Sequence, residues 1–469
     1  MNFKKLTAVA FVAASIIAGA SSIEAAPSVN VNKTYIAINE DCSDEILNKV
    51  KADFEAKKGE MEKTSLNLYK ISKDEALKVI AAFPGIKSIN LNQVEVGNLE
   101  FVKNLTNLEE ITVSYDKKYE PLDISALNGN TKLTKVYISS ARISDISPIS
   151  GCTNVANLTF YSCVLMNNSI KPIAALTNVK ELSLYGCNVD DFAHLAPMTN
   201  LKRINIYATK ANDGATLDYN HLSEIKSLED IKAGLTQMTS VAFMKDLPNV
   251  KNIEFLGEQL TDYETLENCK PLESIMYWAH NQMDLDGNKI GKAQSLKKLK
   301  IWSTKNVINW AGLSNLTNLE DLRILTVREC NSPETAIDTS FMANMTKLKE
   351  VQFSEVQING LAKMGSAVER IDLYKINTKD EKPFDLSTIV APNAKSLNVN
   401  DTKVANAESI LKNCPNITKL ELTKVEGITN YDFIKELPEK SYVTLSKGAI
   451  TEELQKELKE TKKIFVSFR

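Results

Sequence analysis

The sequence predicts an α/β solenoid with a parallel β-sheet on its concave face, short 3₁₀ or irregular convex segments, a helical N-terminal cap and a helix-strand C-terminal cap. Three observations predict it. A short apolar pattern recurs about every 23.6 residues, apolar and polar residues alternate within each copy as on a strand, and helical periodicity flanks the copies. Although 469 residues would ordinarily form two to four domains, a repeat protein grows as one domain by adding units.

Composition excludes several function classes. The chain has 56 basic and 59 acidic side chains, a net charge of −3, and no basic block, so nucleic-acid binding driven by counterion release is not expected. Seven cysteines without a C-x-x-C pair exclude a disulfide scaffold, a zinc ribbon and a thioredoxin-like site. No membrane span is predicted, because no apolar stretch of about 18 residues follows the N-terminal segment.

The first segment, residues 1–26, has the order of a secretory signal peptide. Two lysines precede the apolar run Leu6–Ala20, and small residues follow. We expect cleavage after Ala25 or Ala26, with Ala20 as the alternative. The mature protein is therefore expected to be secreted or held at the cell surface, with periplasmic residence as a further option.

The repeats, residues 85–446, follow an L-x-x-L-x-L frame. The fourth and sixth positions alternate with polar ones, so both point from a short strand into the core. Successive strands run parallel, and too few residues remain for a long return helix. The first position of each of the fifteen copies is occupied by Ile86, Leu108, Leu133, Val155, Val179, Leu201, Leu228, Val250, Leu272, Leu296, Leu319, Leu348, Val368, Ala394 and Ile417.

The period matches that of leucine-rich repeats, which the chain resembles across almost all of its mature length. Residues 143–149, ISDISPI, followed by Thr153-Asn154-Val155, closely resemble the repeat of the bacterial internalin family. The resemblance implies an exported, non-enzymatic recognition protein. The chain has no wall-anchor motif, which favours release, periplasmic residence or non-covalent attachment. The ninth position, usually Asn in the family, departs from that pattern: it is Asp116, Ala141, Cys163, Cys187, Thr209, Thr236, Glu258 or His280.

The predicted caps close the two ends of the solenoid, which would otherwise expose core. In the N-terminal cap, residues 27–84, one helix places Ile46, Leu47, Val50 and Phe54 on one face. A second helix opens with a Ser72-x-x-Glu75 capping box, carries Leu77 and Ile80, and stops at Phe83-Pro84-Gly85. At the C-terminal end a half-repeat, Val443/Leu445, precedes the cap, residues 447–469, which combines a helix over 451–462 with a strand at Ile464, Val466 and Phe468.

The seventh position of each repeat points onto the concave sheet surface and carries a run of large side chains. The predicted binding residues in this row are Tyr161, Tyr185, Tyr207, Leu256, Trp278, Trp302, Leu325 and Tyr374, with Lys300 and Arg323 beside them. An exposed apolar row of this kind is typical of an interaction surface. Packing of rings across neighbouring strands is the alternative explanation. Mixed charges beside the row would contribute orientation and specificity.

No catalytic or metal chemistry is predicted, and no cofactor is implied. His194, His221 and His280 lie in different repeats, away from any nucleophile motif. The segment Asp284-x-Asp286-x-Asn288 imitates a calcium loop, but Lys289 and Ser295 replace its required Gly and Glu. Cys163 and Cys187 could pair after export, or remain thiols packed among the loops.

Three stretched repeats, at about 210–227, 328–346 and 377–393, are loops that either carry binding contacts or are tolerated insertions. The sequence as a whole predicts an exported, non-enzymatic protein that binds a protein or glycan, for example on a host surface, through the concave row. The alternative is a structural or adhesion component of the cell envelope without a specific concave-face ligand.

Overall fold

The computed structural model describes residues 29–31, 35–39, 43–60, 64–116, 120–212, 215–236, 238–256, 260–278, 284–327, 336–378 and 382–469. The predicted signal peptide, His280, and parts of the three stretched repeats lie outside these residues. The chain forms two compact units, Met1–Asn167 and Asn168–Arg469, called here the N-terminal unit and the C-terminal unit.

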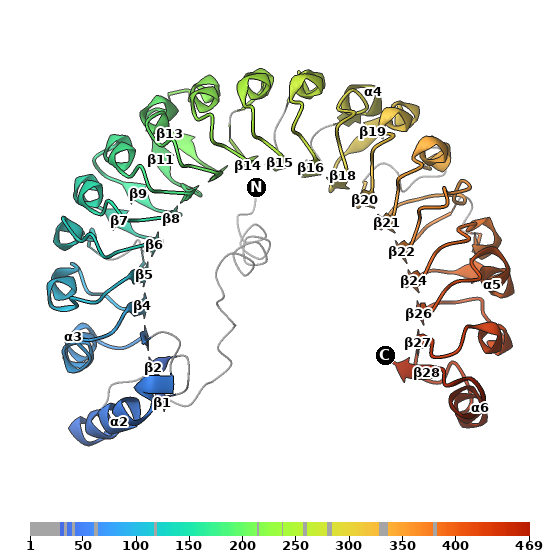
Figure 1. Ribbon diagram of the computed structural model, residues 1–469, viewed down its shortest axis with the longest axis horizontal. Coiled ribbons are helices and arrows are strands. Elements are labelled where there is room, and N and C mark those ends of the chain that lie inside the picture. Colours follow the sequence, from blue (N-terminus) through green and yellow to red (C-terminus); the bar gives the residue numbers. More distant parts are fainter. Residues whose placement is uncertain are drawn as a thin grey trace. The chain divides into compact units, whose positions relative to one another are not determined.

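The N-terminal unit contains a sheet in which one antiparallel pair, β1 with β2, is followed by parallel strands (Figure 1). Its strands are β1 (Val29–Val31), β2 (Ile36–Ile38), β3 (Ser65–Tyr69), β4 (Ser88–Asn92), β5 (Glu110–Ser114), β6 (Lys135–Ser139) and β8 (Asn157–Tyr161). Strand β3 was not predicted, because Lys63 occupies the position where an apolar residue would begin its frame. Leu66 and Leu68 are nonetheless buried and extend the repeat pattern toward the N-terminus.

Two helices precede the first predicted repeat, α2 (Asp44–Lys57) and α3 (Lys73–Ala82). The predicted cap of α3 is present, since Ser72 Oγ accepts a hydrogen bond from the Glu75 amide at 3.3 Å. Two side chains predicted to face the core are exposed instead: Ile46 is 39% and Leu77 is 36% exposed. Each lies just beyond the arc of buried residues on its helix, at about 100° per residue.

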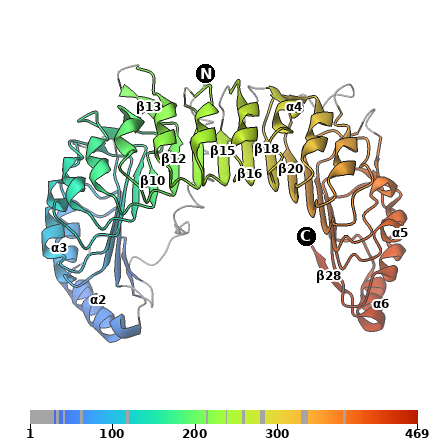
Figure 2. The same ribbon diagram turned by 45° about the horizontal axis from the view of Figure 1, so that its top comes forward.

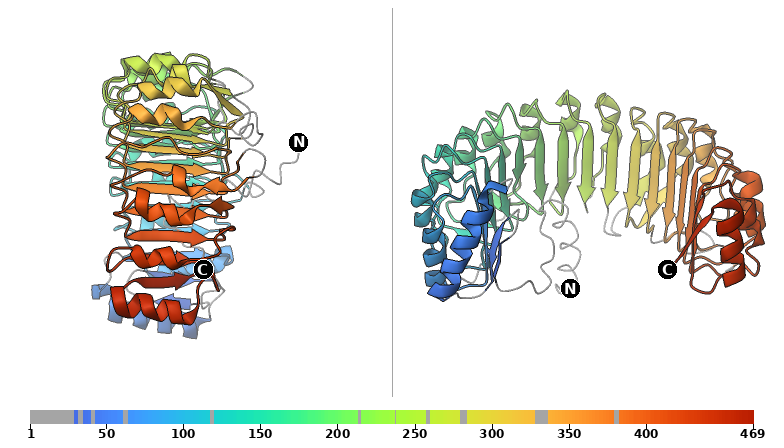
Figure 3. Two further views of the ribbon diagram at one scale, coloured as in Figure 1. Left: turned by 90° about the vertical axis from the view of Figure 1, so that its right-hand side faces the viewer. Right: turned by 60° about the horizontal axis from the view of Figure 1, so that its bottom comes forward.

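The C-terminal unit has one parallel sheet in which successive strands pair in register (Figure 3). Its strands are β10 (Glu181–Ser183), β12 (Arg203–Tyr207), β14 (Asp230–Gly234), β15 (Asn252–Leu256), β16 (Ser274–Trp278), β18 (Lys298–Trp302), β20 (Asp321–Leu325), β21 (Glu350–Ser354), β22 (Arg370–Tyr374), β24 (Ser396–Asn400), β26 (Lys419–Thr423), β27 (Tyr442–Leu445) and β28 (Phe465–Phe468). Each of the fifteen predicted repeats supplies one strand, from β4 to β26. The alternation of apolar and polar residues therefore predicted the positions of these strands correctly.

Short helical segments form the side opposite the sheet, as predicted, so that within the C-terminal unit the strands lie on the inner side of the curve (Figure 2). In the N-terminal unit these segments are η3 (Glu100–Asn104), η4 (Ser125–Leu127) and η5 (Ser147–Gly151), with η2 (Lys58–Glu60) after α2. In the C-terminal unit they are η6 (Lys171–Ala175), η7 (Phe192–Leu195), η9 (Tyr219–Glu224), η10 (Ala242–Asp246), η11 (Tyr263–Asn268), α4 (Gly287–Ile290), η12 (Trp310–Asn315), η14 (Thr339–Asn344), η16 (Leu386–Thr388), η17 (Ala407–Ser409), α5 (Ile410–Asn413) and η18 (Asp432–Glu436).

Small two-stranded parallel sheets join neighbouring repeats between the strands and the convex segments. These pairs are β7 (Arg142–Ile143) with β9 (Val164–Leu165), β11 (Asn188–Val189) with β13 (Lys210–Ala211), β17 (Asp284–Asp286) with β19 (Asn306–Ile308), and β23 (Phe384–Asp385) with β25 (Val404–Ala405). They give the backbone of the loops hydrogen-bond partners in the next repeat.

The chain leaves most strands through a left-handed residue at the eighth repeat position. A positive φ occurs there at Gln93, Ser140, Ser162, Gly186, Ala208, Leu235, Ser303, Thr326, Glu355, Lys375, Asp401 and Lys424. This conformation costs a non-glycine residue roughly 1–2 kcal/mol. Its recurrence shows that the bend out of the sheet is imposed by the repeat and not by the local residue.

Side chains at the ninth position hold the loops together in place of the usual Asn. Thr209 Oγ1 donates to the Leu184 carbonyl oxygen at 2.8 Å, and Cys163 Sγ donates to that of Ile138 at 3.3 Å. Cys187 Sγ bonds the Tyr185 carbonyl oxygen at 3.6 Å. Both cysteines are buried thiols, which agrees with the second of the two alternatives for this pair.

The C-terminal end closes with α6 (Glu452–Lys462) and β28. Thr451 caps the helix, its Oγ1 accepting from the Leu454 amide at 3.2 Å. The predicted half-repeat, helix and final strand are all present. None of the described helices is both long enough and apolar enough to cross a membrane.

Candidate functional site

The seventh-position side chains stand at the ends of the sheet strands on the concave side. Strand pairing places Tyr207, Gly234, Leu256, Trp278, Trp302 and Leu325 in register on six neighbouring strands. Tyr185 follows β10 and stacks on Tyr207 with ring centroids 4.8 Å apart. We call Tyr185, Tyr207, Leu256, Trp278, Trp302 and Leu325 the aromatic row.

Gly234 allows the aromatic row to continue through β14 without a gap. A Cβ at this position would lie 2.3 Å from Leu256 Cβ and 2.6 Å from Tyr207 Cδ2. Both distances are shorter than any real carbon contact, so the neighbouring side chains occupy the space that a side chain at Gly234 would need. Tyr207 and Leu256 therefore fill the space above Gly234.

The two tryptophans form the centre of the row. Trp278 and Trp302 stack with centroids 4.6 Å apart and ring planes 13° apart. Leu256, in register on the other side of Trp278, is only 9% exposed, so it supports the stack more than it faces solvent. The rings of Tyr185, Tyr207, Trp278 and Trp302 are half-buried.

Two predicted residues are not counted in the aromatic row. The in-register neighbours of Tyr374 are Ser354 and Asn400, and its side chain is exposed, with Lys375 Nζ 5.2 Å from the ring centroid. Tyr161 ends β8 in the N-terminal unit, beside Ser139, and is half-buried.

A charged groove of about 520 Å³ runs beside the row, over the third and fifth positions of strands β12 to β20. Arg323 in this groove is held by Asp321 through two hydrogen bonds of 2.9 and 3.0 Å, and it also reaches Glu350 at 3.2 Å. The hydrogen bonds to Asp321 raise the pKa of the Arg323 guanidinium further. Arg323 is therefore a fixed, partly neutralised cation.

Lys300, the other predicted charged residue, has a different environment. Its Nζ lies 4.6 Å from the centroid of the Trp302 ring, a cation–π contact. Burial lowers the pKa of Lys300, and the neighbouring positive charge of Arg323 lowers it further. Among the described residues it has no carboxylate within ion-pair distance.

An exposed pair of stacked aromatic side chains on the last two strands was not predicted from the sequence. Tyr442 and Phe465 are paired residues of β27 and β28, they are 58% and 47% exposed, and their rings stack at 5.3 Å. They occupy the third position of the repeat frame, as the first residues of their strands, so they project on the same side of the sheet as the third-position residues of the groove. Extending the repeat frame through the last two strands would have found them.

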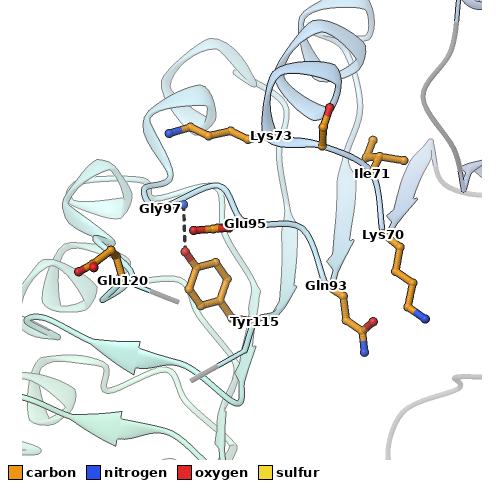
Figure 4. Close-up of a pocket in the computed structure, with 9 residues that line it drawn as sticks. Lys70, Ile71, Lys73, Gln93, Glu95, Gly97, Tyr115 and Glu120 are labelled. Atoms are coloured by element: carbon orange, nitrogen blue, oxygen red, sulfur yellow. Dashed lines mark hydrogen bonds between the residues drawn. The ribbon is translucent and has the colours of Figure 1, made fainter. Parts of the chain in front are cut away.

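A hollow in the N-terminal unit lies beside the turns that follow β3, β4 and β5 (Figure 4). It measures about 840 Å³ and has Lys73, Glu95 and Glu120 at its border. Tyr115 Oη accepts a hydrogen bond from the Gly97 amide at 3.2 Å. The tyrosine therefore ties two loops together.

The described histidines and the segment that imitates a calcium loop have structural partners. His194 Nε2 lies 3.0 Å from Asp190 Oδ2, and His221 Nδ1 lies 2.6 Å from Asp191 Oδ1. Asp286 caps α4 by accepting from the Asn288 amide at 2.9 Å. These side chains therefore stabilise the loops in which they lie.

Comparison with known proteins gives likenesses of fold. No family model matches the chain, and no curated protein does. Among solved structures, the chain is similar to an internalin (inlF) of Listeria monocytogenes, with a TM-score of 0.49 and 20% identity over 65% of this chain and 85% of the other. It is also similar to a leucine-rich-repeat protein of Leptospira interrogans, with a TM-score of 0.48 and 14% identity over 83% and 98% of the two chains. The chain has a leucine-rich-repeat fold, and its likeness to these structures is one of fold.

Proposed function

We propose that this chain is an exported, non-enzymatic recognition protein that binds a protein or glycan partner through the aromatic row. The observation that carries the proposal is the row itself. The seven neighbouring strands from β10 to β20 present four half-buried aromatic rings and two leucines on the concave side of the sheet, and only β14 contributes a glycine instead. Tyr and Trp dominate the energetics of binding surfaces, and contiguous apolar patches on protein surfaces usually serve interaction.

The competing function is a structural or adhesion component whose rings only stabilise the sheet. The stacking of Tyr185 on Tyr207 and of Trp278 on Trp302 favours it, because cross-strand aromatic pairs are worth up to about 1 kcal/mol each. Packing of rings between neighbouring strands, however, does not account for the charged groove beside the rings. A groove with fixed charges next to an apolar row is what orientation of a partner requires.

The test replaces Tyr185, Trp278 and Trp302 together with Ala and measures binding to a glycan array and to intact host cells. The third tryptophan of the chain, Trp310, gives a matched control, because it lies in η12 and stacks on Phe341 away from the sheet. We expect the triple variant to lose binding and Trp310→Ala to retain it. Unchanged binding by a triple variant that keeps its circular-dichroism spectrum would contradict the proposal.

Export is the second part of the proposal and rests on the N-terminal sequence. Expression of the full chain in a bacterium should release a protein that begins after Ala25 or Ala26, or after Ala20, as read by N-terminal mass spectrometry. A chain that stays in the cytosol with Met1 intact would contradict export.

A further inference from the structure

Strand β18 presents two lysines and a tryptophan side by side. Its sequence KLKIW alternates so that Leu299 and Ile301 are buried, while Lys298, Lys300 and Trp302 project onto the concave side. The fifth position of the repeat thus places the Lys300 ammonium beside the aromatic row, 4.6 Å from the Trp302 ring centroid, and the third position places Lys298 two residues earlier on the same side of the strand.

The other basic side chains of the groove have carboxylate partners. Arg203 pairs with Glu181, Lys232 pairs with Glu254 at 3.1 Å, and Arg323 pairs with Asp321. Lys298 and Lys300 have none among the described residues. The groove is lined by five basic and three acidic side chains, a local charge of +2, in a chain of net charge −3. Its unpaired positive charge is concentrated on β18.

The tryptophans present their edges to a ligand. Because the rings of Trp278 and Trp302 stack across neighbouring strands at 4.6 Å, the faces that meet are covered, and mainly ring edges point away from the sheet. Ring edges carry the positive end of the aromatic quadrupole, so they attract carboxylate and carbonyl oxygens. A sugar ring, by contrast, would need an open aromatic face to stack on.

We propose that the concave side of β18 anchors an acidic polypeptide segment of the partner. A side-chain carboxylate binds the ammonium groups of Lys298 and Lys300, the carbonyl oxygens of the adjoining residues meet the edges of Trp278 and Trp302, and the apolar side chains of the segment pack along the aromatic row. The burial of Lys300 supports this assignment, since a carboxylate there would compensate for the hydration that burial takes from the ammonium group. The inference rests on the proposed function, because it uses the same row.

The experiment selects a phage-displayed library of random dodecapeptides on the purified protein. Enriched peptides are then labelled with fluorescein, and their dissociation constants are measured by fluorescence polarisation. We expect enriched peptides to combine Asp or Glu with aromatic or aliphatic residues. The variant Lys298→Met/Lys300→Met, which keeps the apolar stems, should weaken binding about tenfold or more, and Lys298→Arg/Lys300→Arg should restore it.

The matched control is Lys419→Met, an exposed lysine at the third position of β26, which should leave the dissociation constant unchanged. The inference is overturned if no acidic peptide is enriched, if binding ignores the lysine pair, or if an oligomer of uronic acid binds the protein more tightly than the peptides do. Binding that is lost in Trp278→Ala/Trp302→Ala but not in the lysine variant would remove the acidic anchor and leave the proposed function intact. Binding that ignores the tryptophans would remove the proposed function itself.

Discussion

The hydroxyl of Tyr277 is buried in the core of the C-terminal unit and has no hydrogen-bond partner among the described residues. Its side chain is 2% exposed and lies among the rings of Phe255 and Tyr263, both at 5.8 Å between centroids. Burial also raises the pKa of this phenol far above its usual value. An unpaired hydroxyl in such a place costs about 1–3 kcal/mol of stability.

Tyr277→Phe removes that cost while keeping the ring. The void left by the oxygen, about 15 Å³, would cost about 0.4 kcal/mol. The variant should therefore be more stable than the parent by about 1–2 kcal/mol. We expect the midpoint of urea unfolding, followed by circular dichroism, to rise with an unchanged slope.

Tyr263 supplies the control in the same cluster. Its Oη accepts a hydrogen bond from the Asp286 amide at 2.6 Å, so Tyr263→Phe leaves a backbone donor without its partner. The free energy of unfolding of this variant should be lower than that of the parent by about 0.5–1.5 kcal/mol. If Tyr277→Phe is instead destabilised like Tyr263→Phe, the Tyr277 hydroxyl has a partner and the reasoning is refuted.

Three further predictions concern the repeat turns, the aromatic row and pH. Ala208 has a φ of +54°, so Ala208→Gly should raise the stability by up to about 1 kcal/mol, measured by urea unfolding. Gly234→Ala should destabilise the protein by about 1–3 kcal/mol and change the near-ultraviolet circular dichroism of the tyrosines, because its Cβ would collide with Leu256 and Tyr207. The hydrogen bond with Asp191 raises the pKa of His221 above its ordinary 6.5. This stabilisation is fully present below pH 6.5 and is lost as the pH rises through the folded pKa, so His221→Gln should flatten the pH dependence of the unfolding midpoint there.

Each of these has a result that would contradict it. For the turn, Ala52→Gly in the interior of α2 makes the same chemical change at an ordinary helical position and should lower the free energy of unfolding by about 1 kcal/mol. If Ala208→Gly also lowered the free energy of unfolding, the predicted strain at Ala208 would be contradicted. For the row, a Gly234→Ala protein as stable as the parent would show that the row can open. For pH, identical curves for the parent and His221→Gln would show that the contact with Asp191 does not contribute.

Much of the fold could be predicted because each strand alternates in the same way in every copy. Strand β3 escaped prediction because a lysine stands where its frame should begin. The left-handed turn could not be predicted either. Ala208, Thr326 and Lys375 carry no sign of it, since the rest of the repeat forces the bend.

The register of the aromatic row also followed from the frame, but its physical character did not. Frame position cannot tell that the ring of Tyr207 closes over Gly234. The frame position also does not reveal that Arg323 is neutralised by Asp321. Lys300, two residues before Trp302, has no such carboxylate partner among the described residues and contacts the Trp302 ring instead. These differences depend on side-chain conformations, which a pattern of residue types leaves open.

A dissociation constant tests most directly whether the aromatic row binds a partner. With the first ligand identified on cells, arrays or phage, titration calorimetry on the parent, Trp278→Ala/Trp302→Ala and the convex control Trp310→Ala compares the two surfaces. A central tryptophan in a binding surface is worth about 2 kcal/mol or more, which is roughly a thirtyfold loss of affinity. We predict a loss of at least that size for the double variant and none for Trp310→Ala. Equal affinity for the parent and the double variant would contradict the account.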